Sequence, residues 1–244
     1  MSRVLLITGG AGGIGAAVAH RFAATGGRVV VADIDETAGQ EVASAVGGLF
    51  VRTDVSSEDD NRRAVETALW KFGGLDLVHL NAGTGGAGGA GDDFDLSRYR
   101  RTLAVNLDGT MFGLRAALPA LAATGGGAVI VTASLAGLGP ASFDPVYSAT
   151  KHAIIGLVRS LAPAWTEARV TINAICPGFV DTRMISGLRP LISSGGLAVA
   201  TPDEVAHAVE QLAASGATGE AWTVQAGTPP TPFTFPAIDL TRAG

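Results

Sequence analysis

Short apolar runs alternate with helical segments along the sequence, and this alternation restricts the fold more than any other feature. The runs at 4–8, 29–32, 49–51, 75–80, 128–133 and 170–175 are rich in valine, isoleucine and leucine, and a further short strand is expected at 220–224. The segments between them carry helix start signals, such as Ser57 before EDDNRRAVETALWKF, and Thr201 before a proline and Glu204. Strands that are apolar on both faces and alternate with helices form parallel sheets that are covered on both sides. We therefore predict a doubly wound α/β fold, with a parallel seven-stranded sheet and helices on both faces.

One domain is expected across residues 1–244, because no linker interrupts the alternation. The net charge of −5 without a basic stripe argues against a nucleic-acid partner, and no apolar run approaches the roughly 18 residues that a membrane span needs. The N-terminus lacks the pattern of a signal peptide, and Cys176 is the only cysteine, so a cytoplasmic protein is expected. The four histidines have no spacing typical of a metal site, and no metal is expected.

The sequence TGGAGGIG at 8–15 leaves the first predicted strand and enters a helical pattern. Glycines permit a tight turn and a close backbone approach to a pyrophosphate, while the helix N-terminus supplies free N–H groups and the positive end of a dipole. A glycine triplet alone is more often a plain turn. Here a strand, the loop, a helix and a second strand follow one another, and this order predicts a Rossmann-type dinucleotide site.

Asp33 ends the second predicted strand, where a carboxylate can accept hydrogen bonds from the adenosine ribose and repels the 2′-phosphate of NADP. Neither Gly12 nor Ile34 offers a cationic side chain that would pair with that phosphate. The sequence therefore favours NAD. The alternative is that Asp33 shares a helix cap with Asp35.

The stretch YSATK at 147–151 places a phenol and an ammonium four positions apart. Asp144 and Pro145 directly before it are typical of an N-cap and a first helical position, so a helix is expected to begin near 145. Tyr147 and Lys151 then share one face, with Cβ atoms roughly 5–6 Å apart. This spacing is common by chance, so the pair alone does not indicate catalysis.

The order of TGGAGGIG, NAG at 81–83, Asn106, Ser134 and YSATK resembles that of the short-chain dehydrogenase/reductase family, over nearly the whole chain. The resemblance implies that Tyr147 is the general acid/base and that Lys151 holds the nicotinamide ribose. A nearby cation also favours tyrosinate, so Lys151 is expected to lower the pKa of Tyr147. Ser134 would bond the substrate oxygen and Asn106 would bind a water that links Lys151 to solvent. The structural alternatives are a turn serine and a helix-bending asparagine.

The same resemblance identifies Asp54-Val55 as lying against the adenine and PGFVDT at 177–182 as lying along the nicotinamide. The cofactor-binding positions that it implies are Gly9, Gly13, Ile14, Gly15, Asp33, Asp54, Val55, Asn81, Ala82, Gly83, Tyr147, Lys151, Pro177, Gly178, Val180 and Thr182. The substrate positions that it implies are Ser134, Leu135, Phe143, Tyr147, Phe179 and Met184.

A substrate loop is expected at about 182–200, and the glycine-rich segment 83–91 is expected to form one pocket wall and to move on binding. The apolar candidates favour a neutral secondary alcohol or ketone, although Arg183 and Arg189 could instead meet a carboxylate. We thus expect an NAD-dependent alcohol dehydrogenase or carbonyl reductase. The alternatives are a reductase of acyl-thioester ketones or sterols, and a non-catalytic NAD-binding regulator.

The C-terminal tail, about 226–244, is rich in proline and is expected to be extended or irregular. It reads VQAGTPPTPF where the family commonly has Asp-Gly-Gly. The resemblance implies a homo-oligomer, and this departure leaves open whether it is a tetramer or a dimer. Pro163 is expected to kink the helix that contains it, or to end it early.

Overall fold

The apolar runs of the sequence form one eight-stranded sheet in the computed structural model, which describes residues 2–86, 88–89 and 91–237. Its strands are β1 (Val4–Thr8), β2 (Arg28–Asp33), β3 (Leu49–Arg52), β4 (Leu77–Leu80), β5 (Gly127–Thr132), β6 (Val170–Pro177), β9 (Ala221–Val224) and β10 (Thr231–Pro232). The order is β10-β9-β6-β5-β4-β1-β2-β3, and every pair except β9 with β10 is parallel. The chain order reverses at β1 and β4, which is where an open α/β sheet forms its ligand crevice.

The prediction of seven strands is wrong by one. After Gly227, whose φ is +70°, the tail turns back, and β10 pairs antiparallel with β9. The amide of Phe233 donates to the Ala221 carbonyl at 2.7 Å. Proline is tolerated here because β10 is an edge strand. The part of the predicted tail beyond residue 237 lies outside the described residues.

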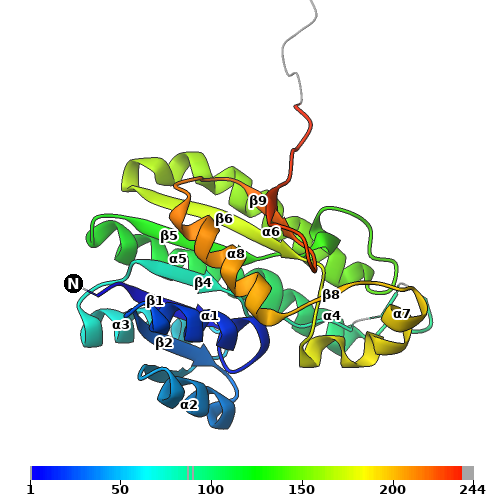
Figure 1. Ribbon diagram of the computed structural model, residues 1–244, viewed down its shortest axis with the longest axis horizontal. Coiled ribbons are helices and arrows are strands. Elements are labelled where there is room, and N and C mark those ends of the chain that lie inside the picture. The colour runs from blue at the N-terminus through cyan, green and yellow to red at the C-terminus, as the bar shows by residue number, and fades with distance from the viewer. Residues whose placement is uncertain (1, 87, 90, 238–244) are drawn as a thin grey trace, which may run out of the picture.

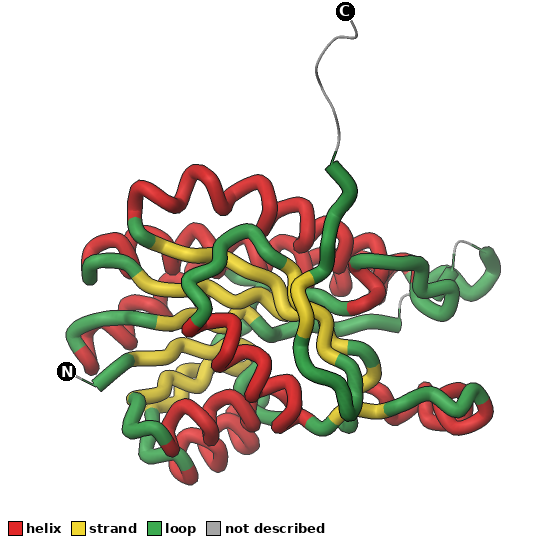
Figure 2. Tube along the Cα trace, turned by 45° about the horizontal axis from the view of Figure 1, so that its top comes forward, coloured by secondary structure: helices red, strands yellow, loops and turns green. Residues whose placement is uncertain are grey.

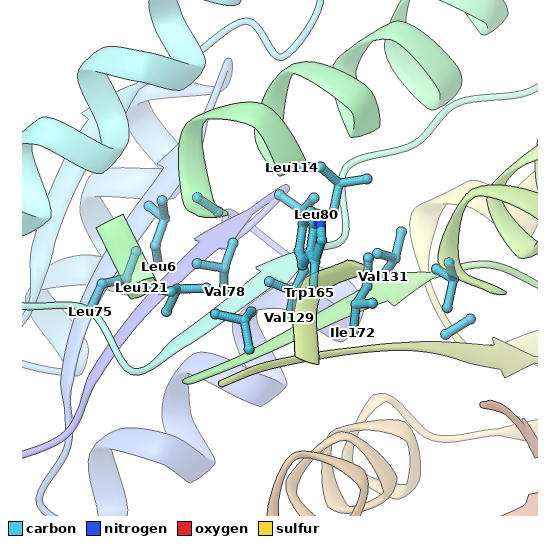
Figure 3. Close-up of a cluster of buried hydrophobic side chains, with 14 of the residues drawn as sticks. Leu6, Leu75, Val78, Leu80, Leu114, Leu121, Val129, Val131, Trp165 and Ile172 are labelled. Carbon is cyan, nitrogen blue, oxygen red and sulfur yellow. The ribbon is translucent and has the colours of Figure 1, made fainter. Parts of the chain in front are cut away.

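Helices cover both faces of the sheet, as predicted (Figures 1 and 2). One face carries α1 (Gly13–Ala24), α2 (Glu36–Ala45) and α8 (Pro202–Ala214), and the other carries α3 (Glu58–Phe72), α5 (Gly109–Ala123) and α6 (Pro145–Trp165). Successive residues of β1 alternate between the two cores, since Leu6 packs with the α3, α5 and α6 side and Leu5 packs with the α1 and α8 side. Figure 3 shows Leu114 of α5 and Trp165 of α6 in the same buried cluster as the strand residues Leu80 and Val131.

The shorter elements connect the main ones, and all except η3, which precedes β6, lie near the carboxyl ends of the strands. They are α4 (Leu96–Leu103), the π-helix η1 (Ala104–Asp108), the 3-10 helices η2 (Leu135–Gly137), η3 (Thr166–Ala168) and η4 (Arg183–Leu188), the helix α7 (Arg189–Ser194), and the strands β7 (Phe179–Val180) and β8 (Val199–Ala200). The predicted substrate loop is therefore largely structured. β8 closes it by pairing with β7 in a separate two-stranded sheet.

The predicted helix starts are confirmed. Asp144 caps α6 by accepting from the Tyr147 amide, and Thr201 and Glu204 form a reciprocal capping box at α8. Pro163 does not end α6 at once, because the helix reaches Trp165 and continues into η3. Among the described residues, no helix combines the length and the apolar character that crossing a membrane requires.

Candidate active site

The glycine loop after β1 is shaped by close backbone contacts. Gly9 and Gly13 have φ values of +63° and +53°, a region that residues with a Cβ rarely adopt. A Cβ at Gly9 would lie 2.8 Å from Ala82 Cα, and one at Gly15 would lie 2.1 Å from the Gly9 carbonyl oxygen. The glycines thus allow the loop to lie against the start of α1 and against the segment after β4.

The N-terminus of α1 has no side-chain cap, since Gly12 occupies the N-cap position. Its first amides therefore remain available for an anion such as a pyrophosphate. Ile14, in the first turn, packs against the core on the α1 side of the sheet. A Cβ at Gly13 would meet Thr182 Cγ2 at 2.8 Å, so the loop also borders the beginning of the segment 182–200.

Asp33 lies at the carboxyl end of β2 and faces the glycine loop. One carboxylate oxygen accepts from the Ala11 amide at 2.9 Å, and the other accepts from the Asp35 amide at 3.0 Å. The cap of α2 is Asp35, whose side chain accepts from the Ala38 amide at 3.1 Å. Asp35 therefore caps the first turn of α2, while Asp33 bonds both the glycine loop and the amide of the cap residue.

Asn81, Ala82 and Gly83 follow β4 and lie directly beside the glycine loop. Thr8 Oγ1 accepts from the amides of Asn81 (3.0 Å) and Ala82 (3.3 Å), and Asn81 Nδ2 donates to the Gly9 carbonyl at 3.1 Å. A Cβ at Gly83 would be 3.6 Å from Lys151 Nζ. The NAG segment therefore links the glycine loop to the YSATK segment.

The predicted adenine-side residues follow β3. Val55 is buried, and a Cβ at Gly109 would lie 2.9 Å from its side chain. Asp54 accepts from the amide and the hydroxyl of Ser56 at 3.0 and 2.7 Å. The Asp54 carboxylate therefore stabilises the turn at 54–56.

Tyr147, Ser134 and Lys151 come together at the carboxyl ends of β5 and β6. The Ser134 hydroxyl lies near enough to the Tyr147 phenol to affect its pKa, and its Oγ donates to the Pro177 carbonyl at 3.4 Å. Lys151 Nζ is 5.4 Å from the centroid of the Tyr147 ring and donates to the Thr132 carbonyl at 2.7 Å. A buried ammonium, a phenol and a hydroxyl thus meet in one place.

The pKa of Tyr147 is raised, chiefly by burial, to about 12, and the side chain of Ser134 opposes this rise. Burial lowers the pKa of Lys151 to about 8. The expectation that Lys151 lowers the pKa of Tyr147 is therefore not met in this arrangement, because desolvation of the phenol dominates. Tyr147 is a phenol at neutral pH here.

Asn106 is fully buried within the π-helix η1. Its Oδ1 accepts from the Thr84 amide at 2.8 Å, and its Nδ2 donates to the Thr84 carbonyl (2.8 Å) and to Thr150 Oγ1 (3.0 Å). The side chain therefore anchors the start of the glycine-rich segment 83–91. Its assignment to a bound water stays a prediction. Residues 87 and 90 of this segment lie outside the described residues.

The predicted substrate positions are only partly brought together. The rings of Phe143 and Phe179 are 6.1 Å apart, and a Cβ at Gly178 would be 3.3 Å from Leu135 Cδ1. Pro177 and Val180 are buried at the end of β6 and in β7. Met184 is exposed on η4 and belongs to neither contact. Arg189, a candidate for a substrate carboxylate, is paired with Asp181.

Sequence reasoning missed two residues of this region. Thr132 accepts from Lys151 through its carbonyl, and its hydroxyl donates to Asn81 Oδ1 at 3.1 Å. Asp144 was predicted only as a helix cap, yet it also accepts from the Gly86 amide. Cys176 is buried, and burial raises the pKa of its thiol to about 12.

Comparison with known proteins shows that this chain is similar to oxidoreductases that use a nicotinamide cofactor. Residues 3–191 match the family described as short chain dehydrogenase. A solved structure of 3-ketoacyl-(acyl-carrier-protein) reductase from Brucella melitensis, complexed with NADH, is similar with a TM-score of 0.84 and 30% identity, covering 92% of this chain and 97% of that one.

Among curated relatives, the sex determination protein tasselseed-2 of Zea mays is 43% identical over 75% of this chain, which spans only 56% of that protein. The cis-4-hydroxycyclohexanecarboxylate dehydrogenase of Sinomonas cyclohexanicum is 34% identical over 88% of this chain and 90% of its own length. The cyclohexanol dehydrogenase of an Acinetobacter species is 35% identical, over 75% of this chain and 76% of its own.

Proposed function

The chain belongs to the short-chain dehydrogenase family, and from this premise we propose that it is an NAD-dependent dehydrogenase of cyclic secondary alcohols. The observation that carries the proposal is the meeting of Tyr147, Ser134 and Lys151 beside the glycine loop. An intact set of this kind favours catalysis over a role as an NAD-binding regulator.

The residues around the glycine loop fit a dinucleotide. The uncapped start of α1 and the positive-φ glycines offer a cradle for the pyrophosphate, and the carboxylate of Asp33 suits ribose hydroxyls. Its negative charge supports NAD over NADP. Bound NAD would supply the acceptor for the hydride that leaves the carbinol carbon.

The protein's own part in the reaction is to orient the substrate and to move one proton. Ser134 holds the alcohol oxygen, and the Tyr147 oxygen exchanges the hydroxyl proton as the carbon–oxygen double bond forms or is reduced. Because burial raises the pKa of Tyr147 to about 12, a neutral phenol is ready to donate to a ketone at neutral pH. Ketone reduction is therefore favoured near neutrality, and alcohol oxidation is favoured as the pH rises.

The substrate class is supported by an apolar wall and by two relatives. The rings of Phe143 and Phe179 lie near each other and Leu135, which follows Ser134, lies beside Gly178, and apolar side chains of this kind suit a carbon ring. The relatives named for cyclohexanol and for a hydroxycyclohexanecarboxylate act on six-membered rings. The pairing of Arg189 with Asp181 favours the neutral ring over the carboxylate.

The test is a matrix of initial rates, measured by NADH or NADPH absorbance. The substrates are cyclohexanol, cis-4-hydroxycyclohexanecarboxylate, an acyclic secondary alcohol of matched carbon number, and, in reverse, a 3-ketoacyl thioester. The proposal predicts the largest kcat/KM for cyclohexanol with NAD. A preference for NADP or for the thioester would overturn it, and tight NAD binding without turnover of any substrate would favour the regulator.

A further inference from the structure

Asp144 joins two segments that lie far apart in the sequence. One carboxylate oxygen accepts from the Tyr147 amide at 3.1 Å, which caps α6. The other accepts from the Gly86 amide at 2.6 Å. Asp144 is only 7% exposed, so both bonds are largely shielded from water. Hydrogen bonds to a shielded carboxylate are among the stronger ones in proteins.

This position requires a side chain that accepts at both ends. A carboxylate has acceptors on both oxygens, whereas an asparagine of the same shape would turn an NH₂ group toward one of the two amides. A serine caps a helix well but is too short to reach a second segment. The capping role alone therefore does not explain why Asp144 is an aspartate.

The segment that Asp144 holds lies against the catalytic tyrosine. A Cβ at Gly85 would be 2.8 Å from Asp144 Oδ2 and 3.4 Å from Cδ2 of the Tyr147 ring. Arg98 of α4 donates to the Gly86 carbonyl at 3.3 Å, while Asn106 holds both polar backbone groups of Thr84. The segment 84–86 is thus held at both ends beside the Tyr147 phenol.

We propose that Asp144 is a positioning residue for the reaction, holding Gly85 and Gly86 against the Tyr147 ring as the wall that an incoming alcohol meets. The inference rests on the proposed function, in which Tyr147 is the acid/base. Asp144 itself touches neither substrate nor cofactor. It acts by fixing the space beside the phenol.

The charge of Asp144 gives the same residue a second, measurable effect. The titratable groups beside Tyr147 are Asp144 and Lys151, together with Cys176 from β6, and Arg98 of α4 reaches the neighbouring Gly86. The negative charge of Asp144 contributes to the raised pKa of Tyr147, behind the larger effect of burial. Removing that charge is therefore expected to move the rise of alcohol oxidation to lower pH.

Three variants distinguish three roles of Asp144: the cap of α6, the bond from the Gly86 amide (the clamp), and the negative charge. Asp144→Ser keeps the cap and loses both the clamp and the charge, and Asp144→Asn loses the charge and one of the two bonds. Gly85→Ala keeps the charge of Asp144, but its added methyl group is expected to displace Asp144 Oδ2. The matched control is Asp35→Ser, which makes the same change at the N-cap of α2.

We expect Asp144→Ser to raise KM for the alcohol roughly tenfold, as loss of a charge-assisted hydrogen bond would, with a smaller change in kcat and an oxidation profile shifted to lower pH. Asp144→Asn should show the same pH shift with a smaller rise in KM. Gly85→Ala should raise KM without that shift, and Asp35→Ser should change neither quantity. In the ligand-free protein, hydrogen–deuterium exchange at the Gly86 amide should speed up in Asp144→Ser and Gly85→Ala and stay unchanged in Asp35→Ser.

Unchanged exchange at Gly86, or unchanged KM and pH profile in Asp144→Ser and Gly85→Ala of an active enzyme, would overturn the inference. A wild-type protein that oxidises no alcohol with NAD would instead overturn the proposed function, while the exchange experiment would still decide whether Asp144 holds the segment. If Asp144→Ser fails to fold, exchange at Gly86 and KM in Gly85→Ala still test whether Asp144 holds the segment, and the pH profile of Asp144→Asn tests the charge.

Discussion

His79 lies in the centre of β4 and is fully buried. Its Nε2 is 2.8 Å from the Thr132 hydroxyl oxygen, and that hydroxyl donates its single proton to Asn81 Oδ1. Nε2 must therefore donate, and Nδ1 carries no proton and has no hydrogen-bond partner among the described residues. Burial lowers the pKa of His79 from 6.5 to about 3, so the folded protein keeps this imidazole neutral well into the acid range.

This pKa shift links stability to pH with a definite sign. Between pH 6.5 and about 3 the unfolded chain binds a proton at His79 that the folded chain excludes, so stability falls as the pH falls. Each pKa unit corresponds to about 1.4 kcal/mol, so His79 costs about 2 kcal/mol between pH 7 and pH 5 and about 5 kcal/mol over its full range.

The assay is urea unfolding at pH 7 and pH 5, with protein concentration held constant, for wild type, His79→Val and the exposed control His20→Val. Carboxylates such as Asp60, whose pKa is lowered by its bond from the Asp54 amide, destabilise all three proteins equally in acid. The loss of unfolding free energy on going to pH 5 should be about 2 kcal/mol smaller in His79→Val than in the other two. An equal loss of unfolding free energy in all three proteins would refute the conclusion that His79 is buried as a neutral imidazole.

Three further outcomes follow from the site. Asp33→Asn removes the charge that suits the ribose hydroxyls, so NAD affinity measured by calorimetry should fall roughly 10- to 100-fold while the preference over NADP shrinks; unchanged affinities would remove Asp33 from the cofactor site. Lys151→Met removes the buried ammonium that lies 5.4 Å from the centroid of the Tyr147 ring and is expected to hold the nicotinamide ribose, so NAD affinity and kcat/KM should both fall by roughly tenfold or more; unchanged NAD affinity would remove Lys151 from the cofactor site. Gly15→Ala places a methyl 2.1 Å from the Gly9 carbonyl oxygen, and it should weaken NAD binding far more than Gly156→Ala, where a Cβ meets no atom within 4 Å, with equal losses contradicting the loop geometry.

Much of the fold could be predicted because its signals are local. The apolar runs gave the seven main strands, and Asp144-Pro145 and Thr201 gave the starts of α6 and α8. The eighth strand could not be predicted in this way. Its prolines argue for irregular chain, and its pairing depends on an edge of β9 that becomes available only when the sheet is assembled.

The site was predictable to the extent that single motifs carry it. The glycine loop, NAG, Ser134 and YSATK lie together, as their order along the chain indicated. The Asp144 bond to Gly86 joins residues 58 positions apart, and no local pattern marks it. The pKa of Tyr147 also escaped prediction, because the charge pattern suggested a lowering by Lys151 whereas burial, which depends on the whole fold, raises it.

Tyr147 provides the most direct test of the central claim, because the chain has only one other tyrosine. Tyr99 lies on α4, where its ring is 5.6 Å from that of Phe94. The measurement is kcat for NAD-linked oxidation of cyclohexanol, with NAD affinity determined alongside, in Tyr147→Phe and Tyr99→Phe. The account predicts a fall of roughly 100-fold or more in Tyr147→Phe with NAD affinity retained, and wild-type turnover in Tyr99→Phe. Turnover of Tyr147→Phe within a few-fold of wild type, with normal NAD binding, would contradict it.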